Sequence, residues 1–197
     1  MANITNLLGN LTRRGFAARY FDSREQANAY LAERMAGKSV GIGGSVTVKE
    51  MGLDRALTDA GATIFSHQMG STPAQAAQAE CYISSLNGVA ETGELVNIDG
   101  TGNRVASTIY GHKELFLVFG VNKVEEDLER ALWRARNVAG PKNAMRLGRK
   151  TPCALRGDRC YDCDSPERIC RALAILWGPP KGFDIVEVIV VGEHLGL

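Results

Sequence analysis

The feature that most restricts the fold of this sequence is an alternation of short apolar runs with segments of helical character. Five runs have the length of buried strands: 39–43, 62–65, 82–86, 115–119 and 185–191. Helical segments separate several of them, at 24–36, 46–60, 73–80 and 124–137. Such alternation predicts an α/β protein with a largely parallel sheet covered by helices.

Two further runs predict strands outside this simple alternation. Glu94–Ile98 follows the strand at 82–86 after a turn at 87–93. Ala172–Trp177 precedes the last strand, and a Pro-Pro-Lys-Gly turn at 179–182 lies between them. A short turn of this kind favours an antiparallel hairpin, which we expect at one edge of the sheet.

Length and composition indicate one domain that spans residues 1–197. The chain of 197 residues can bury one core but is short for two domains. A net charge of +1 argues against a nucleic-acid partner. The sequence has neither a secretory leader pattern nor an apolar run of membrane-spanning length. We therefore expect a cytoplasmic protein with no membrane span and reduced cysteines.

A glycine-rich loop, Gly41-Ile42-Gly43-Gly44-Ser45, follows the strand at 39–43 and precedes a helix. Glycines let a ligand approach the backbone, and in open α/β sheets this edge is where ligands bind. Because Val46 replaces the third glycine of a dinucleotide fingerprint, the loop indicates an anion site without naming the ligand. The alternative is a tight turn whose Ser45 only caps the helix.

Two polar loops offer groups for the same site. The turn at 87–94 contains Glu91, which could act as a nucleophile or base, and the loop at 99–104 ends in Arg104, which could hold a carboxylate. These residues would surround one pocket if both loops lay at the edge of the glycine loop. Asn-Gly and Asp-Gly pairs are also ordinary turn formers, so a solvated turn is the alternative.

A cysteine cluster lies in a basic segment at about 140–171, which holds eight Lys/Arg and four of the five cysteines. Cys153, Cys160, Cys163 and Cys170 have the spacing C-x6-C-x2-C-x6-C. Four such ligands favour zinc or an iron–sulfur cluster, and the central C-x2-C pair would be the chelating element. A redox disulfide at the central pair, or free thiols, are the alternatives.

These segments together resemble the LUD (lactate utilisation) domain family. Residues 43–53, Gly-Gly-Ser-Val-Thr-Val-Lys-Glu-Met-Gly-Leu, are similar to the G-G-S-x-T-x-x-E-x-G-L signature of that family. Residues 87–95 resemble its acid-Thr-Gly turn, and 121–123, 141–147 and 190–196 also fit. The block at 151–170 is similar to a single-domain, cysteine-containing branch of the family.

The resemblance implies a three-layer αβα fold like that of the CoA transferases, ribose-5-phosphate isomerase and glucosamine-6-phosphate deaminase. It also implies a link to the oxidation of L-lactate to pyruvate, with iron–sulfur oxidoreductase subunits as partners. A possible homo-oligomer is a separate expectation. With the loops above, the resemblance gives a predicted ligand-binding set: Gly41, Gly43, Gly44, Ser45, Thr47, Glu50, Asn87, Thr92, Gly93, Asn103 and Arg104.

Three functions remain open from the sequence. The first is a component of lactate or 2-hydroxy-acid oxidation that binds a small anionic substrate and a metal or iron–sulfur cluster. The second is a stand-alone enzyme of the CoA-transferase or sugar-phosphate-isomerase kind, with Glu91 as catalytic nucleophile or base. The third is a non-catalytic, metal-binding regulator or scaffold.

Overall fold

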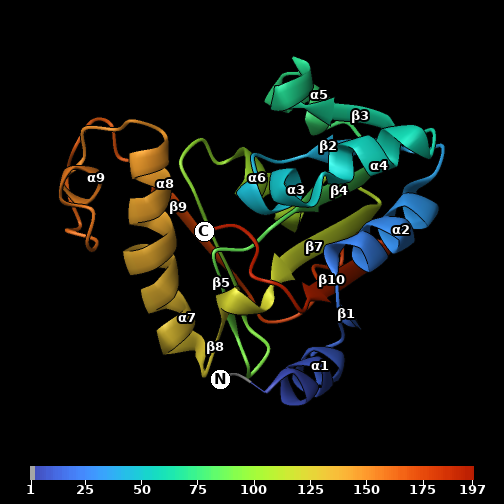
Figure 1. Cartoon of the computed structure of the whole chain (residues 1–197), viewed down its shortest axis with the longest axis horizontal. Helices are drawn as coiled ribbons and strands as arrows, with labels where there is room; N and C mark the ends of the chain where they lie inside the picture. Colours follow the sequence, from blue (N-terminus) through green and yellow to red (C-terminus); the bar gives the residue numbers. More distant parts are fainter. Residues whose placement is uncertain (1–2) are drawn as a thin grey trace.

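A six-stranded parallel sheet forms the centre of the protein in a computed structural model that describes residues 3–197 (Figure 1). Its strand order is β1-β10-β7-β4-β2-β3, and every neighbouring pair is parallel. The expected α/β architecture with a mostly parallel sheet is confirmed. The strands are β1 (Ala17–Phe21), β2 (Ser39–Ile42), β3 (Thr63–Ser66), β4 (Cys81–Ser84), β7 (Glu114–Gly120) and β10 (Ile185–Val191).

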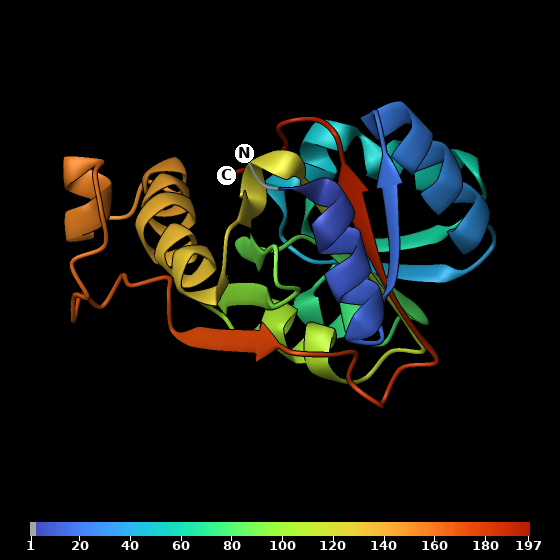
Figure 2. The same ribbon diagram turned by 90° about the horizontal axis from the view of Figure 1, so that it is seen from below.

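Helices cover both faces of this sheet, which gives the three-layer αβα arrangement. On one face, α2 (Arg24–Met35), α3 (Val46–Met51) and α4 (Leu53–Asp59) pack on side chains such as Val40, Phe116 and Ile189. On the other face lies α1 (Ile4–Arg13), whose Leu7 and Leu11 are fully buried. Figure 2 shows α1 and α2 on opposite sides of β1 and β10.

The predicted helix at 46–60 is divided in two. Gly52 ends α3 and begins α4 with a φ of 64°, a left-handed conformation that a glycine adopts at little cost. The helix predicted at 73–80 is shorter than expected, since α5 covers only Pro73–Ala76 behind a capping box of Thr72 and Gln75. Short 3₁₀ turns follow β3 and β7, at η1 (His67–Met69) and η2 (Val121–Lys123).

A second, smaller sheet packs beside the first and has the order β8-β5-β6-β9. Its last strand overturns the expected hairpin, because β9 pairs antiparallel with β6 while β10 lies in the main sheet. The Pro/Gly turn region at 179–182 therefore connects two sheets. The bounds are β5 (Gly88–Ala90), β6 (Leu95–Asp99), β8 (Val124–Glu125) and β9 (Ala172–Leu176).

One long helical stretch covers the outer side of the small sheet. It begins with α7 (Leu128–Arg134), capped by Asp127, runs through the π-helical segment Ala135–Ala139 and ends as α8 (Gly140–Arg146). The helix was expected from residue 124, but Val124 and Glu125 pair with β5 instead. Pro141 has no N–H to donate, and the π-helical segment just before it is the wider winding found at such interruptions.

Two helices complete the fold. The first, α6 (Asn103–Ile109), packs against β6 and β4, and α9 (Pro152–Arg156) packs against α8 at one end of the molecule (Figure 2). Within residues 3–197, no helix has the length and apolar character needed to cross a membrane.

The three glycines of the loop after β2 have different surroundings. A Cβ atom on Gly41 would lie 2.2 Å from the carbonyl oxygen of Ala76, and one on Gly43 would lie 2.5 Å from the hydroxyl oxygen of Tyr82. A Cβ atom on Gly44 would meet nothing within 4 Å. Gly41 and Gly43 are therefore needed for packing, and Gly44 is the glycine that faces open space.

Gly41→Ala is expected to lower the free energy of unfolding by about 1–3 kcal/mol, because the added methyl group displaces α5 or the Tyr82 ring. Gly44→Ala is the matched control, with an expected change of about 0.5 kcal/mol or less. Urea unfolding of both variants measures the difference. Equal losses in the two variants would contradict the assignment of Gly41 to packing.

Candidate functional site

A pocket lies where β2, β4 and β7 end, between the main sheet and α8. The chain passes from β2 outward to β3 and then returns to β4 on the other side of β2, so strand order reverses here. Ligands of open α/β sheets bind at this kind of reversal. The pocket is small, with a cavity volume of about 50 Å³, and is lined by Gly44, Ser45, Val46, Thr47, Ser85, Leu86, Asn87, Arg104, Lys123, Ala139, Asn143, Arg146 and Leu197.

The charged side chains that line this pocket are all cationic. Arg104 comes from α6, Lys123 from the turn after β7, and Arg146 from the end of α8. Among the described residues, no aspartate or glutamate belongs to the lining. A pocket with three cations and several hydroxyl and amide groups is suited to a small anion.

Arg104 is fixed by the loop that precedes α6. Its backbone N–H donates to a carboxylate oxygen of Asp99 at 2.8 Å, and its guanidinium lies 4.0 Å from the other oxygen. The guanidinium also donates to the carbonyl oxygens of Ile98 and Ser85. Burial lowers the pKa of Arg104, although the nearby Asp99 acts in the opposite direction. These contacts hold the cation at the wall of the pocket.

Lys123 lies at the base of the pocket and is 4% exposed. Its Nζ donates to the Thr47 hydroxyl at 2.8 Å, the Ser85 hydroxyl at 3.0 Å and the Leu86 carbonyl at 3.1 Å. Burial, together with the positive charges of Arg134 and Arg104, lowers the pKa of Lys123 to about 7. This lysine can therefore exchange a proton near neutral pH.

Arg134 supports the pocket from the side of α7. Its guanidinium donates to the carbonyl oxygens of Asn87 at 2.6 Å, Asn122 at 3.1 Å and Leu197 at 3.3 Å. Glu125 lies 3.8 Å from the same guanidinium. Burial lowers the pKa of Arg134. One side chain thus connects the loop after β4, the turn after β7 and the tail that follows β10.

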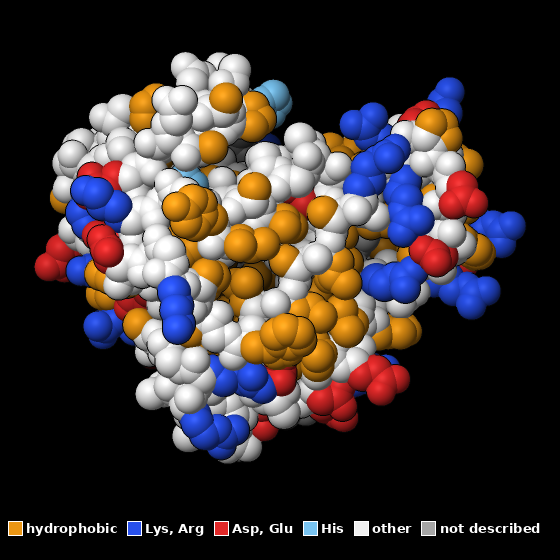
Figure 3. All heavy atoms as spheres, turned by 180° about the vertical axis from the view of Figure 1, so that it is seen from behind, with side chains coloured by type: hydrophobic (Ala, Val, Ile, Leu, Met, Phe, Trp, Pro, Cys, Tyr) orange, Lys and Arg blue, Asp and Glu red, His pale blue; other side chains and the backbone are white. Residues whose placement is uncertain are grey.

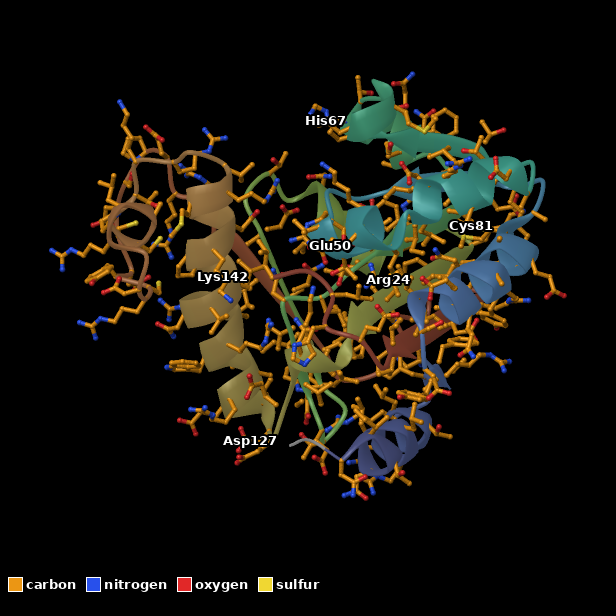
Figure 4. The ribbon with its side chains drawn as sticks, in the orientation of Figure 1. Arg24, Glu50, His67, Cys81, Asp127 and Lys142 are labelled. Atoms are coloured by element: carbon orange, nitrogen blue, oxygen red, sulfur yellow. The ribbon has the colours of Figure 1, made fainter. Side chains whose placement is uncertain are left out.

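The structure brings five of the predicted ligand-binding residues into the lining: Gly44, Ser45, Thr47, Asn87 and Arg104. Gly41 and Gly43 are buried and do not line the pocket, and Asn103 begins α6 without lining it. Glu50 also stays outside the lining and accepts a hydrogen bond from the backbone of Gly196. In Figure 4, Glu50 on α3 and Lys142 on α8 mark the two sides between which the pocket lies.

The turn that contains Glu91 is separated from this pocket. The Glu91 carboxylate accepts from the Asn3 backbone at 2.8 Å and from the Asn6 amide at 3.0 Å, at the start of α1. These hydrogen bonds lower the pKa of Glu91. Thr92 and Gly93 lie against Arg14 at the end of the same helix. The expectation that both polar loops surround one pocket is therefore wrong for the 91–93 turn.

The cysteine segment does not gather a ligand set in the structure. Within residues 3–197, no three His, Cys, Asp or Glu side chains are grouped as metal ligands would be. Cys153, Cys160, Cys163 and Cys170 are free thiols of intermediate exposure. Arg168 donates to the carbonyl oxygens of Cys163 and Cys170. As arranged, these residues do not fit a bound metal, and the predicted metal site stays a prediction.

Position and charge further distinguish this segment from the rest of the chain. Figure 3 shows Lys and Arg side chains gathered at the end of the molecule formed by α8 and α9. Cys81 lies at the start of β4 in the main sheet, whereas α8 and α9 form the other end of the molecule (Figure 4). Burial raises the pKa of the Cys81 thiol to about 12, as expected for a core residue.

A larger hollow of about 520 Å³ lies at the opposite edge of the sheet, where β2, β4 and β7 begin. Its walls include Glu80 and Lys113, which pair with each other at 3.5 Å, and the buried ring of His112. The amino ends of parallel strands are not where open α/β sheets bind ligands. We therefore place the site at the smaller, cationic pocket.

Sequence reasoning missed Lys123, Ser85, Asn143, Arg146 and the supporting Arg134. Lys123 could have been found, since it follows the continuous apolar strand β7 by three residues and thus belongs to the ligand-binding edge. Arg134 could not, because an arginine on an amphipathic helix is ordinarily solvent-exposed.

The fold and this pocket define an α/β domain with an open parallel sheet and a cationic site at the carboxyl edge. The model of the LUD domain family matches residues 4–191, and the chain belongs to this family. A crystal structure of a DUF162 family protein from Deinococcus radiodurans is similar over 96% of each chain, with 12% identity and a TM-score of 0.56. At that identity the likeness shows the fold alone. No curated protein matches the chain.

Proposed function

We propose that this protein is a component of lactate or related 2-hydroxy-acid utilisation and that its cationic pocket binds the small carboxylate. The family as a whole is associated with lactate utilisation, and the chain belongs to it. The observation that carries the proposal is the pocket itself, in which Arg104, Lys123 and Arg146 face a small cavity. A carboxylate would be paired there by charge-assisted hydrogen bonds.

The size of the pocket supports a ligand of few atoms. Sites for drug-sized molecules usually have volumes of about 300–1,000 Å³, whereas this cavity has about 50 Å³. A three-carbon hydroxy or oxo acid suits such a space, and the Ser45, Ser85 and Asn143 side chains offer partners for its second oxygen. The proposal does not use Glu91, which lies at α1. Iron–sulfur partner subunits and a homo-oligomer remain predictions.

Titration calorimetry with L-lactate and with pyruvate tests this proposal. Arg146→Met is expected to weaken binding by about tenfold or more, because a hydrogen bond between charged groups contributes about 1.5–3 kcal/mol. Arg146 is exposed, and among the described residues its guanidinium donates hydrogen bonds only to Asn143, so the fold should tolerate the change.

Arg149→Met is the matched control, because Arg149 is also exposed, lies three residues away and does not line the pocket. It changes the net charge by the same amount and should leave the affinity nearly unchanged. If both variants weakened ligand binding equally, the ligand would be attracted by the overall positive charge of this region and not by a specific site. Absence of binding to the unaltered protein would refute the proposal.

A further inference from the structure

Lys123 has an environment that a purely structural lysine does not need. Its amine is buried at the base of the pocket and contacts two hydroxyls and one carbonyl. Among the described residues, no carboxylate oxygen lies within 4.0 Å of Nζ, although buried lysines are ordinarily paired with acids. The contacts thus hold the amine in place without fixing its charge.

The surrounding charges favour the neutral amine. Arg104 on α6 and Arg134 on α7 face Lys123 and act against its protonation, while Glu50 on α3 acts weakly in the opposite direction. With a pKa of about 7, a large fraction of Lys123 is neutral at physiological pH. The Thr47 and Ser85 hydroxyls can donate as well as accept, so both remain satisfied when the amine loses its proton.

A neutral amine beside cations is the usual activated form of a lysine nucleophile. Desolvation and a neighbouring positive charge are the two known means of activating a lysine that attacks a carbonyl carbon. Both are present here, and the cations that lower the proton affinity also pair with a carboxylate. The acid group of a ligand would therefore be held next to the amine.

We propose that Lys123 binds 2-oxo acids covalently, as an imine, in the pocket between β2, β4 and α8. The inference rests on the proposed function and names the chemistry by which the pocket distinguishes a 2-oxo acid from the corresponding 2-hydroxy acid. A 2-hydroxy acid has no carbonyl carbon at C2, so it binds through charge and hydrogen bonds alone. A 2-oxo acid makes the same contacts and adds a reversible covalent bond.

The step balances without an oxidant or a reductant. The lone pair of Nζ forms a bond to C2 of the oxo acid, and the carbonyl oxygen takes up a proton to give a carbinolamine. The nitrogen releases one of its two protons as the carbinolamine forms, and it releases the second as the hydroxyl group takes up a proton and leaves as water. The net reaction is an amine and a ketone giving an imine and water.

The Lys123 amine meets the pocket on one side and the tail after β10 on another. Gly196 has a φ of +70°, and a Cβ atom there would lie 3.0 Å from Nζ and 2.2 Å from the Thr47 hydroxyl oxygen. A glycine at this position therefore lets the tail pass directly over the amine.

Reductive trapping of the whole chain tests the inference. The protein is incubated with pyruvate and sodium cyanoborohydride, and the modified lysine is located by peptide mass spectrometry. An ordinary exposed lysine has only about one neutral amine in a thousand near pH 7.4, so we expect one modified lysine per chain, at Lys123. The trapping rate should rise between pH 6 and pH 8, by about tenfold, as Lys123 loses its proton.

Three controls complete the experiment. L-Lactate with cyanoborohydride should give no adduct, and Lys123→Arg should give none with pyruvate. Lys142→Arg, a change at an exposed lysine of α8 outside the lining, should keep the adduct. Because the adduct is located on the unaltered protein, the test does not depend on the folding of a variant.

The outcomes separate this inference from the function on which it rests. Pyruvate that binds in calorimetry but leaves no adduct at Lys123 overturns the imine and leaves the carboxylate site standing. Adducts spread over several surface lysines also overturn it. A protein that neither binds pyruvate nor forms an adduct refutes both proposals.

Discussion

Arg134→Met is expected to lower the free energy of unfolding by about 3–5 kcal/mol, the range found when one partner of a buried charged network is removed. Arg134 is 4% exposed, and its guanidinium donates to three backbone carbonyls that belong to three separate segments. Methionine keeps much of the length and packing of the side chain but cannot donate. Each carbonyl left without a donor in the interior costs about 1–3 kcal/mol.

Arg130→Met, one helical turn earlier, is the matched control. Arg130 is exposed, and its guanidinium lies over the Trp133 ring at 5.0 Å. Its loss should change stability by about 0.5 kcal/mol, as is usual for surface positions. Guanidinium unfolding of both variants measures the two effects. Similar small losses would mean that water replaces Arg134 at the three carbonyls.

Most strands of the main sheet could be predicted from the sequence, because they are strongly apolar runs that end at turns or helices. The runs at 82–86 and 115–119 correspond to β4 and β7, which are buried on both faces. β1 was missed because three of its five residues are exposed and the strand includes Arg19 and Tyr20. It forms at the edge, where pairing with β10 compensates for a weak local pattern.

The expected hairpin of β9 and β10 was wrong for a different reason: β9 pairs with another strand. β9 and β10 are close in sequence and separated by a turn, but Ala172–Leu176 pairs with β6 over a register from Leu95 to Asp99. A long-range register of this kind depends on the packing of α7 on the small sheet. Local turn chemistry carries no information about that packing.

Part of the site could be predicted because the sheet topology fixes where some residues lie. Residues that directly follow β2 and β4, such as Ser45 and Asn87, lie at the carboxyl edge wherever the rest of the chain goes. Glu91 follows Asn87 by four residues, and extended chain covers about 3.3 Å per residue. β5 therefore carries Glu91 roughly 13 Å away from the pocket and toward α1.

Charge in the interior was the least predictable property. Glu187 lies in the apolar run of β10 and is 3% exposed. The Tyr30 hydroxyl donates to it at 2.8 Å and Arg19 at 2.7 Å, both from other elements. The same holds for Lys123, whose partners are Thr47 in the first turn of α3 and Ser85 directly after β4. A sequence shows such groups but not the partners that make their burial tolerable.

The burial of Lys123 gives the second large effect, a dependence of stability on pH. The folded chain holds this proton with a pKa of about 7, and the unfolded chain with a pKa of about 10.4. Between these values the unfolded chain binds more protons, so stability increases with pH by about 1.4 kcal/mol per unit. Below pH 7 the full cost of burying the charge is present, and above about 10.4 it has disappeared.

Comparison with Lys123→Met isolates this contribution from that of all other titrating groups. The free energy of unfolding of the unaltered protein minus that of Lys123→Met should increase by roughly 2–3 kcal/mol between pH 7 and pH 9.5. Burial raises the pKa values of Cys81 and Tyr82 to about 12, so both groups also make stability depend on pH, but they are present in both proteins and cancel in the difference. Urea unfolding at several pH values measures the difference.

Lys142→Met provides the matched control for this series. Lys142 is exposed on α8, so its charge should cost the folded state little at any pH, and the corresponding difference should stay flat. A flat difference for Lys123→Met as well would mean that Lys123 stays protonated up to pH 9.5. The amine would then lack the lone pair that attack on a 2-oxo acid requires, and the cationic pocket would bind its ligand by charge alone.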